Sequence, residues 1–157
     1  MSGTRGIVVA VAPGTATDAV DAAFELAAER GVPVLTVRAW HDPDVPLGGW
    51  LRPHGTTAWD ALHQKARQEL HHAVEHAKAA HPEVEVGAVV IDDDPVPFLA
   101  ALTAQAELLV LGRPRRPGPH VSPVDALVRQ AACPVLIVPP ATARSAPEFS
   151  NSPSGRE

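Results

Sequence analysis

The five residues Ile7-Val8-Val9-Ala10-Val11 decide the fold of this chain. The run is wholly apolar and rich in β-branched side chains, and Pro13-Gly14 ends it. Continuous apolar runs of this length are typical of strands covered on both faces, as in parallel sheets, whereas half-exposed strands alternate apolar and polar residues. The rest of the sequence should therefore supply helices for both faces of a sheet.

Helix and strand patterns alternate along the remaining chain. Apolar residues at helical spacing predict four helices, at residues 17–30, 59–77, 95–102 and 123–130. Short apolar runs predict four more strands, at residues 34–40, 83–91, 108–111 and 135–138. Because each parallel connection crosses over and buries a helix on one face, the sequence predicts one doubly wound, five-stranded parallel α/β sheet with helices on both faces.

Capping residues mark the ends of these helices. Gly31 follows the first helix, and Pro82 stops the second. Asp94-Pro95 and Ser122-Pro123 each place a capping side chain before a proline at the first helical position. These signals fix where the third and fourth helices should begin.

Length and composition indicate one domain with an aliphatic core. The 157 residues are enough for a single domain, which we expect at residues 1–140, and only 4% of them are aromatic. Residues 141–157 carry few apolar side chains and are predicted to be a disordered tail. The net charge of −5 argues against nucleic-acid or anionic-membrane partners. With no leader or membrane-spanning run in the sequence, we expect a cytoplasmic protein.

The single cysteine and the scattered histidines give no enzyme signature. Cys133 cannot form an intrachain disulfide, and its place before the last apolar run predicts a buried thiol. Ser122 is explained as a helix cap, and no base partner for it is evident. His72 and His76 could clamp a metal from one helix face, but a solvated face is the preferred reading.

Two further groups could serve a ligand. The run Asp92-Asp93-Asp94 could hold magnesium, although Asp94 is already explained as a cap and the others as a polar strand end. Trp50 could line a cleft, whereas Trp59 has the spacing of a core residue. No metal site is therefore expected. In a doubly wound sheet, a ligand would lie beyond the carboxyl ends of the strands, in the loops that follow them.

Three stretches of the chain resemble the universal stress protein family. They are Gly6-Ile-Val-Val-Ala-Val11, Arg38-Ala-Trp-His41, and Ala106-Glu-Leu-Leu-Val-Leu-Gly112 with the later Ala132-Cys-Pro-Val135. The resemblance implies the adenine nucleotide alpha hydrolase-like fold with strand order 3-2-1-4-5. It also implies a homodimer that pairs through the last strand, Val135–Val138, whose apolar edge needs a cover.

The phosphate loop departs from the pattern of nucleotide-binding members of that family. Their pattern is Gly, two residues, Gly, nine residues, Gly, then Ser or Thr. Here Gly112 and Ser122 match, but Arg115 and Val121 stand at the second and third glycine positions, and the insert before Val121 has only five residues. Side chains at those positions obstruct the close approach of backbone amides to phosphate. The prolines of the loop also remove amide donors, at Pro114, Pro117 and Pro119.

The end of the first strand also departs from the family. Ala12 stands in the segment Ala12-Pro13-Gly14 where the family usually carries an Asp that contacts the nucleotide. Ala39 matches the position whose backbone approaches the adenine.

The resemblance therefore implies a non-catalytic stress-response protein that needs no cofactor and acts through protein partners or a small ligand. The alternative is an ATP- or AMP-binding stress sensor in which charge replaces the lost amide contacts, carried by Arg113, Arg115 and Arg116.

Overall fold

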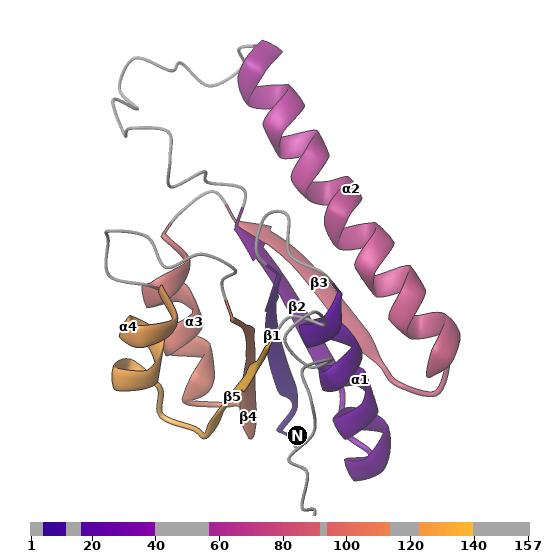
Figure 1. The fold of residues 1–157 in the computed structure, drawn as a ribbon, viewed down its shortest axis with the longest axis vertical. Coiled ribbons are helices and arrows are strands. Elements are labelled where there is room, and N and C mark those ends of the chain that lie inside the picture. Colours follow the sequence, from indigo (N-terminus) through magenta and orange to yellow (C-terminus); the bar gives the residue numbers. More distant parts are fainter. Residues whose placement is uncertain (1–4, 12–16, 40–56, 92–93, 114–122, 140–157) are drawn as a thin grey trace, which may run out of the picture.

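The computed structural model describes residues 5–11, 17–39, 57–91, 94–113 and 123–139, called the described residues below. Strands and helices alternate along them (Figure 1). In chain order the elements are β1 (Ile7–Val11), α1 (Asp18–Arg30), β2 (Val34–Ala39), α2 (Thr57–Ala80), β3 (Val86–Ile91), α3 (Pro95–Thr103), β4 (Leu108–Gly112), α4 (Pro123–Gln130) and β5 (Val135–Val138). None of the helices in this part of the chain is long and apolar enough to cross a membrane.

The strands form one parallel sheet in the order β3-β2-β1-β4-β5. β1 lies at its centre, with Ile7 level with Val34 of β2 and with Leu108 of β4. Ile7 and Val9 have no exposed surface. This order confirms the predicted fold class and strand order. From β1 the chain proceeds to β2 and β3 on one side and then returns to the other side of β1 for β4 and β5.

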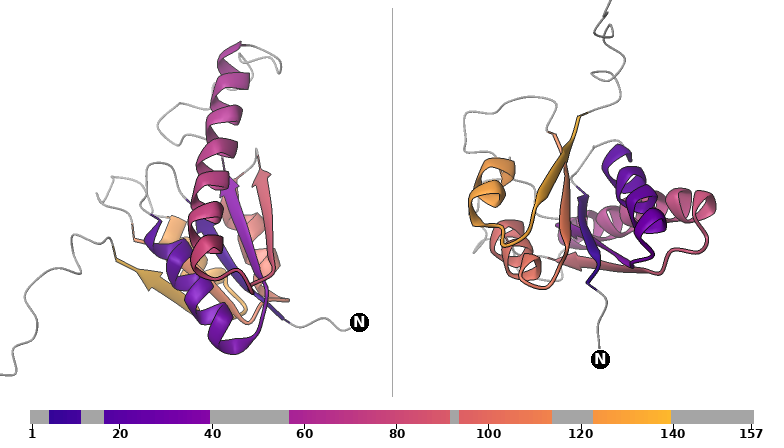
Figure 2. Two further views of the ribbon diagram at one scale, coloured as in Figure 1. Left: turned by 90° about the vertical axis from the view of Figure 1, so that its right-hand side faces the viewer. Right: turned by 90° about the horizontal axis from the view of Figure 1, so that it is seen from below.

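Two helices cover each face of the sheet. α1 and α2 lie on one face and α3 and α4 on the other, which the view from below separates clearly (Figure 2). Alternate residues of β1 belong to two hydrophobic clusters, one on each face of the sheet. Ile7 and Val9 pack with Phe24 of α1, and Val8 packs with Leu99 of α3 and Leu127 of α4. Burial of β1 on both faces explains its unbroken apolar sequence.

The peptide group between Gly6 and Ile7 joins both neighbours of β1. Its amide donates to the Pro33 carbonyl at 2.9 Å, and its carbonyl accepts from the Glu107 amide at 2.9 Å. A Cβ built on Gly6 would lie 2.6 Å from the Pro33 carbonyl oxygen. Only glycine fits where β1 enters the sheet, because the neighbouring backbone would collide with any side chain.

Two of the predicted helix ends are confirmed. Gly31 closes α1 in the left-handed conformation, with φ of 67°. At α3, the Asp94 carboxylate accepts a hydrogen bond from the Val96 amide at 3.0 Å, and Pro95 occupies the first turn. α4 begins at Pro123 as expected, while its predicted cap, Ser122, lies outside the described residues.

The predicted start of the third strand is wrong by three residues. β3 begins at Val86 rather than at Glu83. The Val84 amide donates to the His81 carbonyl at 3.1 Å, so these residues close a turn after α2. A backbone amide used in that turn cannot pair with a neighbouring strand. The predicted last residue of the second strand, Trp40, lies outside the described residues.

Candidate functional site

The carboxyl ends of β1, β2 and β4 meet at one edge of the sheet. Val11 ends β1 level with Arg38 of β2, and Ala39 and Gly112 end the two strands that flank β1. The chain turns to β2 on one side of β1 and to β4 on the other, so the strand order reverses here. Ligands of doubly wound sheets bind outside this point. The structure thus places Ala39, Gly112 and Arg113 at the expected edge.

The other predicted site residues lie outside the described residues. They are Ala12, Pro13, Gly14, Arg115, Arg116, Val121 and Ser122. The same holds for Asp92, Asp93 and Trp50, and for the side chain of Trp59. Their assignments stay predictions.

Gly112 does not need to be glycine for the fold. Among the described glycines only Gly31 has a positive φ. A Cβ on Gly112 would meet the Ala19 Cβ at 3.8 Å, an ordinary van der Waals contact. The absence of a side chain therefore leaves room between the end of β4 and the first turn of α1.

The backbone amide of Arg113 is already used by the sheet. It donates to the Val138 carbonyl at 2.9 Å and so extends the contact between β4 and β5. The Arg113 side chain is exposed. This residue can offer charge to an anion, but its amide is bound within the fold.

A buried arginine occupies the end of β2. Arg38 is only 3% exposed, and its guanidinium donates to the carbonyl of Ala39 and to the Glu69 carboxylate of α2, the latter at 3.1 Å. The Arg38 Nε finds no hydrogen-bond partner among the described residues. The pair connects α2 to the sheet and places a cation against the Ala39 carbonyl at the carboxyl end of β2.

Sequence reasoning missed the role of this pair. The sequence marks Arg38 only as part of a family motif, although an arginine inside a strand with apolar neighbours is itself unusual, because buried charges need a partner. The partner Glu69 lies more than thirty positions away along the chain, and nothing in the local pattern of α2 marks it. Only the packing of α2 over β2 brings the two together.

Acidic side chains border the same edge at the start of α1. Asp18 and Asp21 lie in the first turn of α1, where they stabilise the helix dipole. The Thr17 hydroxyl donates to the Asp21 carboxylate at 3.4 Å, and the Asp21 amide donates to the Thr17 carbonyl at 2.9 Å. These carboxylates reduce the attraction of the α1 amino terminus for a phosphate.

The predicted metal and thiol candidates lie elsewhere. His72 and His76 are exposed on α2, and His76 lies 4.0 Å from the Asp21 carboxylate. Within the described residues, no three His, Cys, Asp or Glu side chains come together in a way that could hold a metal ion. Cys133 is half-buried rather than buried as predicted, and its partial burial raises the pKa of the thiol. A raised pKa lowers the fraction of thiolate, which is the nucleophilic form.

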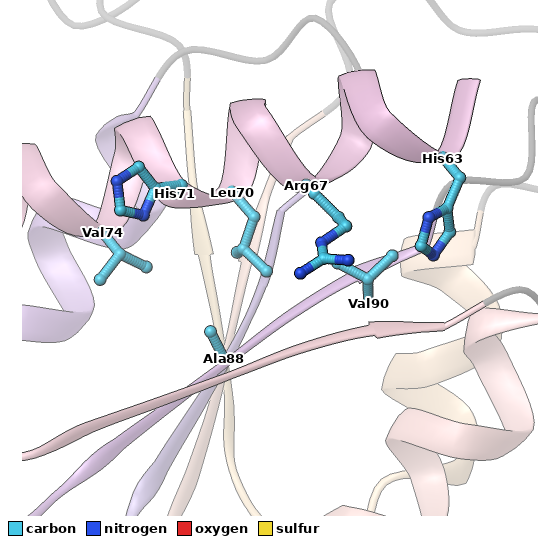
Figure 3. A pocket seen from close by; sticks show the side chains of 7 residues that line it. All are labelled: His63, Arg67, Leu70, His71, Val74, Ala88 and Val90. Carbon is cyan, nitrogen blue, oxygen red and sulfur yellow. The ribbon is translucent and has the colours of Figure 1, made fainter. Parts of the chain in front are cut away.

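A groove that sequence reasoning did not predict lies at the far edge of the sheet, between α2 and β3. It has a volume of about 400 Å³. Basic and apolar side chains descend from α2 toward small residues of β3 (Figure 3), and the lining comprises His63, Arg67, Leu70, His71 and Val74 of α2 with Ala88 and Val90 of β3. No single segment carries this pattern, since the groove exists only where α2 crosses the edge strand.

The sequence matches one family model and is similar to several known proteins. The model of the universal stress protein family matches residues 3–139. A universal stress protein of Mycobacterium tuberculosis is 31% identical over 126 residues, which is 76% of this chain but 38% of that protein. A second one from the same organism is 33% identical over 97 residues, 61% of this chain and 30% of that protein. The chain thus spans less than half of the length of these curated relatives.

Solved structures share the fold. A universal stress protein in complex with cAMP aligns with a TM-score of 0.60 at 24% identity. The alignment covers 88% of this chain and 99% of that chain. One from Archaeoglobus fulgidus in complex with dAMP aligns with a TM-score of 0.60 at 21% identity, over 86% and 98% of the two chains. A family protein from Burkholderia pseudomallei is 28% identical, with a TM-score of 0.52 over 84% of this chain and 95% of its own.

Proposed function

The chain belongs to the universal stress protein family, and from this we propose that it is a non-catalytic, cytoplasmic stress-response protein with a degenerate ATP loop. It acts as a homodimer, through protein partners or a small ligand. The observation that carries the proposal is the use of backbone groups at the site edge. The Ala39 carbonyl accepts from Arg38, and the Arg113 amide donates to Val138.

The residues around that edge support the view that the chain binds nucleotides weakly, if at all at micromolar concentration. A phosphate cradle depends on free backbone amides, and the first amide after Gly112 is held by β5. The sequence removes three further donors at the prolines of residues 114–119 and two glycines at Arg115 and Val121. The carboxylates of the first turn of α1 add repulsion of polyphosphate beside Gly112. All of these features disfavour the binding of a nucleotide phosphate.

The apolar edge at β5 supports the homodimer. β5 pairs only with β4 among the described strands, and Leu136 and Ile137 on it are 37% and 38% exposed. Val128 of α4 adds an apolar side chain that is 51% exposed. An unpaired apolar strand edge promotes association, and pairing with the same strand of a second copy would cover it.

The second candidate function is an ATP- or AMP-binding stress sensor. Relatives of known structure hold cAMP and dAMP, and Arg113 is exposed at the edge where a phosphate would lie. With Arg115 and Arg116, it would replace amide contacts by charge.

Calorimetric titration with Mg-ATP and with AMP tests the proposal. The wild-type chain is expected to show no micromolar binding of either nucleotide. A variant with Arg113, Arg115 and Arg116 all changed to alanine runs beside it, with Arg129→Ala of α4 as a control for loss of an exposed arginine. Micromolar binding that disappears in the triple variant but survives in the control would contradict the proposal and establish the sensor.

A further inference from the structure

The groove between α2 and β3 lies at the edge of the sheet opposite to β5, beside the outermost strand β3. Figure 3 shows His63 and Arg67 extending from α2 toward Val90, and Leu70 and Val74 above Ala88. The groove therefore combines an apolar floor with a basic wall. A site of this composition can bind a chain that is both apolar and anionic.

Small residues on β3 keep the groove open. Ala88 lies level with Thr36 and Val90 level with Arg38, whose side chain reaches α2, so Ala88 and Val90 face the same helix. Ala88 is exposed, and its methyl group fills little of the space beneath α2. The ion pair between Arg38 and Glu69 holds α2 over β2. The helix therefore overhangs β3 without packing closely on its outer side.

The backbone of β3 offers hydrogen bonds along the groove. The Val34 amide donates to the Glu85 carbonyl at 2.9 Å, and the Thr36 hydroxyl donates to the Gly87 carbonyl at 3.0 Å. In a parallel ladder, successive residues turn their amides and carbonyls to opposite sides. The odd-numbered residues of β3 therefore face β2, and Ala88 and its even-numbered neighbours turn their amides and carbonyls outward. No other described strand pairs with that side.

The charge of the groove is locally opposite to that of the chain. The protein carries a net charge of −5, but the one formal charge among the described residues that line the groove is the guanidinium of Arg67; His71, one helical turn away, is charged only when protonated. Glu69 of the same helix is paired with Arg38, and Glu75 lies 3.8 Å from His71. Arg67 thus presents an exposed cation above an edge strand whose amides face outward.

We propose that this groove binds an extended acidic segment of a partner protein, which adds as a further strand to β3 beneath α2. Alternate residues of an extended chain lie about 6.7 Å apart, close to the rise of about 6 Å between Arg67 and His71, so an acidic side chain can pair with Arg67 while the next one on the same side reaches the His71 ring. A free amphiphile would leave the outward amides of β3 without partners, whereas a strand uses them. The inference rests on the partner-binding part of the proposed function.

The test is a titration of the isotope-labelled protein with two blocked hexapeptides, followed by NMR. One peptide alternates valine and glutamate, and the other alternates valine and lysine. The glutamate peptide should shift the amide signals of β3 and of the groove face of α2, and should slow exchange of the Ala88 amide. The lysine peptide should leave these signals unmoved. Arg67→Glu should weaken binding about tenfold, while the matched reversal Lys65→Glu, which lies outside the groove, should change it less than about twofold.

Ala88→Pro tests the strand addition itself. The Ala88 amide faces outward, so proline removes a donor for the partner without removing one from the β2 ladder. The folded variant should lose binding, and Arg67→Glu carries the test if the variant does not fold. No binding of the glutamate peptide at millimolar concentration, equal binding of the lysine peptide, or unshifted β3 amides would overturn the inference. Self-association through β3 before peptide is added would overturn it in favour of a second copy. The nucleotide titration tests the carboxyl edge of the sheet, whereas the peptide titration tests the groove beside β3. The proposed function and this inference can therefore fail independently.

Discussion

The two edge strands of this sheet occupy equivalent positions in the topology and have different surroundings. β5 is short and presents Leu136 and Ile137 to the surface. β3 is overhung by α2, a helix of 24 residues that extends Arg67 toward Val90 (Figure 3). One edge is apolar on its surface, and the other combines outward amides with a basic wall.

The difference between the edges predicts two separate kinds of contact. Apolar strand edges favour pairing with an identical strand, because the same surface complements itself about a two-fold axis. A basic groove repels its own copy and selects an acidic chain. We therefore expect self-association at β5 and partner binding at β3, each sensitive to changes at its own edge.

The largest effect is expected at the polar anchor of the β3 side. Arg38→Ala leaves Glu69 without its partner and removes a side chain that is 96% buried, so the free energy of unfolding should fall by about 3 kcal/mol. Urea denaturation measures it, with the exposed Arg67→Ala as the control. A loss of less than about 1 kcal/mol would mean that α2 does not depend on this anchor.

The next effect concerns the apolar edge. Ile137→Lys places a charge on β5 and should raise the dissociation constant of the proposed homodimer by about a hundredfold, equal to roughly 2.7 kcal/mol. Sedimentation across a concentration series measures it. Ala88→Lys, a charge of the same sign on the opposite edge strand, should leave the dimer unchanged. Equal weakening by both changes would remove the distinction between the edges.

A smaller effect on stability is expected at Thr103, which holds the turn before β5. Thr103 is 1% exposed, and its hydroxyl donates to the Ala100 carbonyl at 2.5 Å and accepts from the Ala132 amide at 2.9 Å. Thr103→Val leaves that amide unpaired, so the free energy of unfolding should fall by about 1–2 kcal/mol. Thr103→Ser retains the hydroxyl and should lose less. A loss for Thr103→Ser as large as that for Thr103→Val in urea denaturation would mean that the hydroxyl contributes no more than the methyl group.

The smallest effect is a pH dependence at Cys133, just before β5. Partial burial raises the pKa of the thiol in the folded chain above that in the unfolded chain. The resulting stability is present below the unfolded pKa and is lost as pH rises through the folded one. Stability should therefore fall slightly more steeply above pH 8 in the wild type than in Cys133→Ala. Parallel curves from urea denaturation across that range would contradict this.

Local signals predicted the sheet well because each depends on neighbouring residues. The apolar run of β1, the αL glycine at Gly31 and the cap at Asp94 act over a few positions, and the structure confirms all three. The start of β3 was predicted too early because apolar spacing does not reveal a turn closed by the backbone of His81 and Val84.

The site was less predictable because it depends on contacts between distant residues. The edge that carries Ala39 and Gly112 followed from the topology of the sheet. The anchor between Arg38 and Glu69, and the groove beside it, arise from the angle at which α2 crosses the sheet. The residue pattern within α2 or β3 does not predict that angle.

The peptide group between Gly6 and Ile7 has a consequence for the order of folding. Its amide meets Pro33, a partner close in sequence, while its carbonyl meets Glu107, which lies most of the chain away. Closing the shorter loop costs less entropy, so the β1–α1–β2 unit should assemble before β4 docks. Until then, one side of the central strand stays open. We expect the half that carries β5 to be the last to gain protection from hydrogen exchange during refolding.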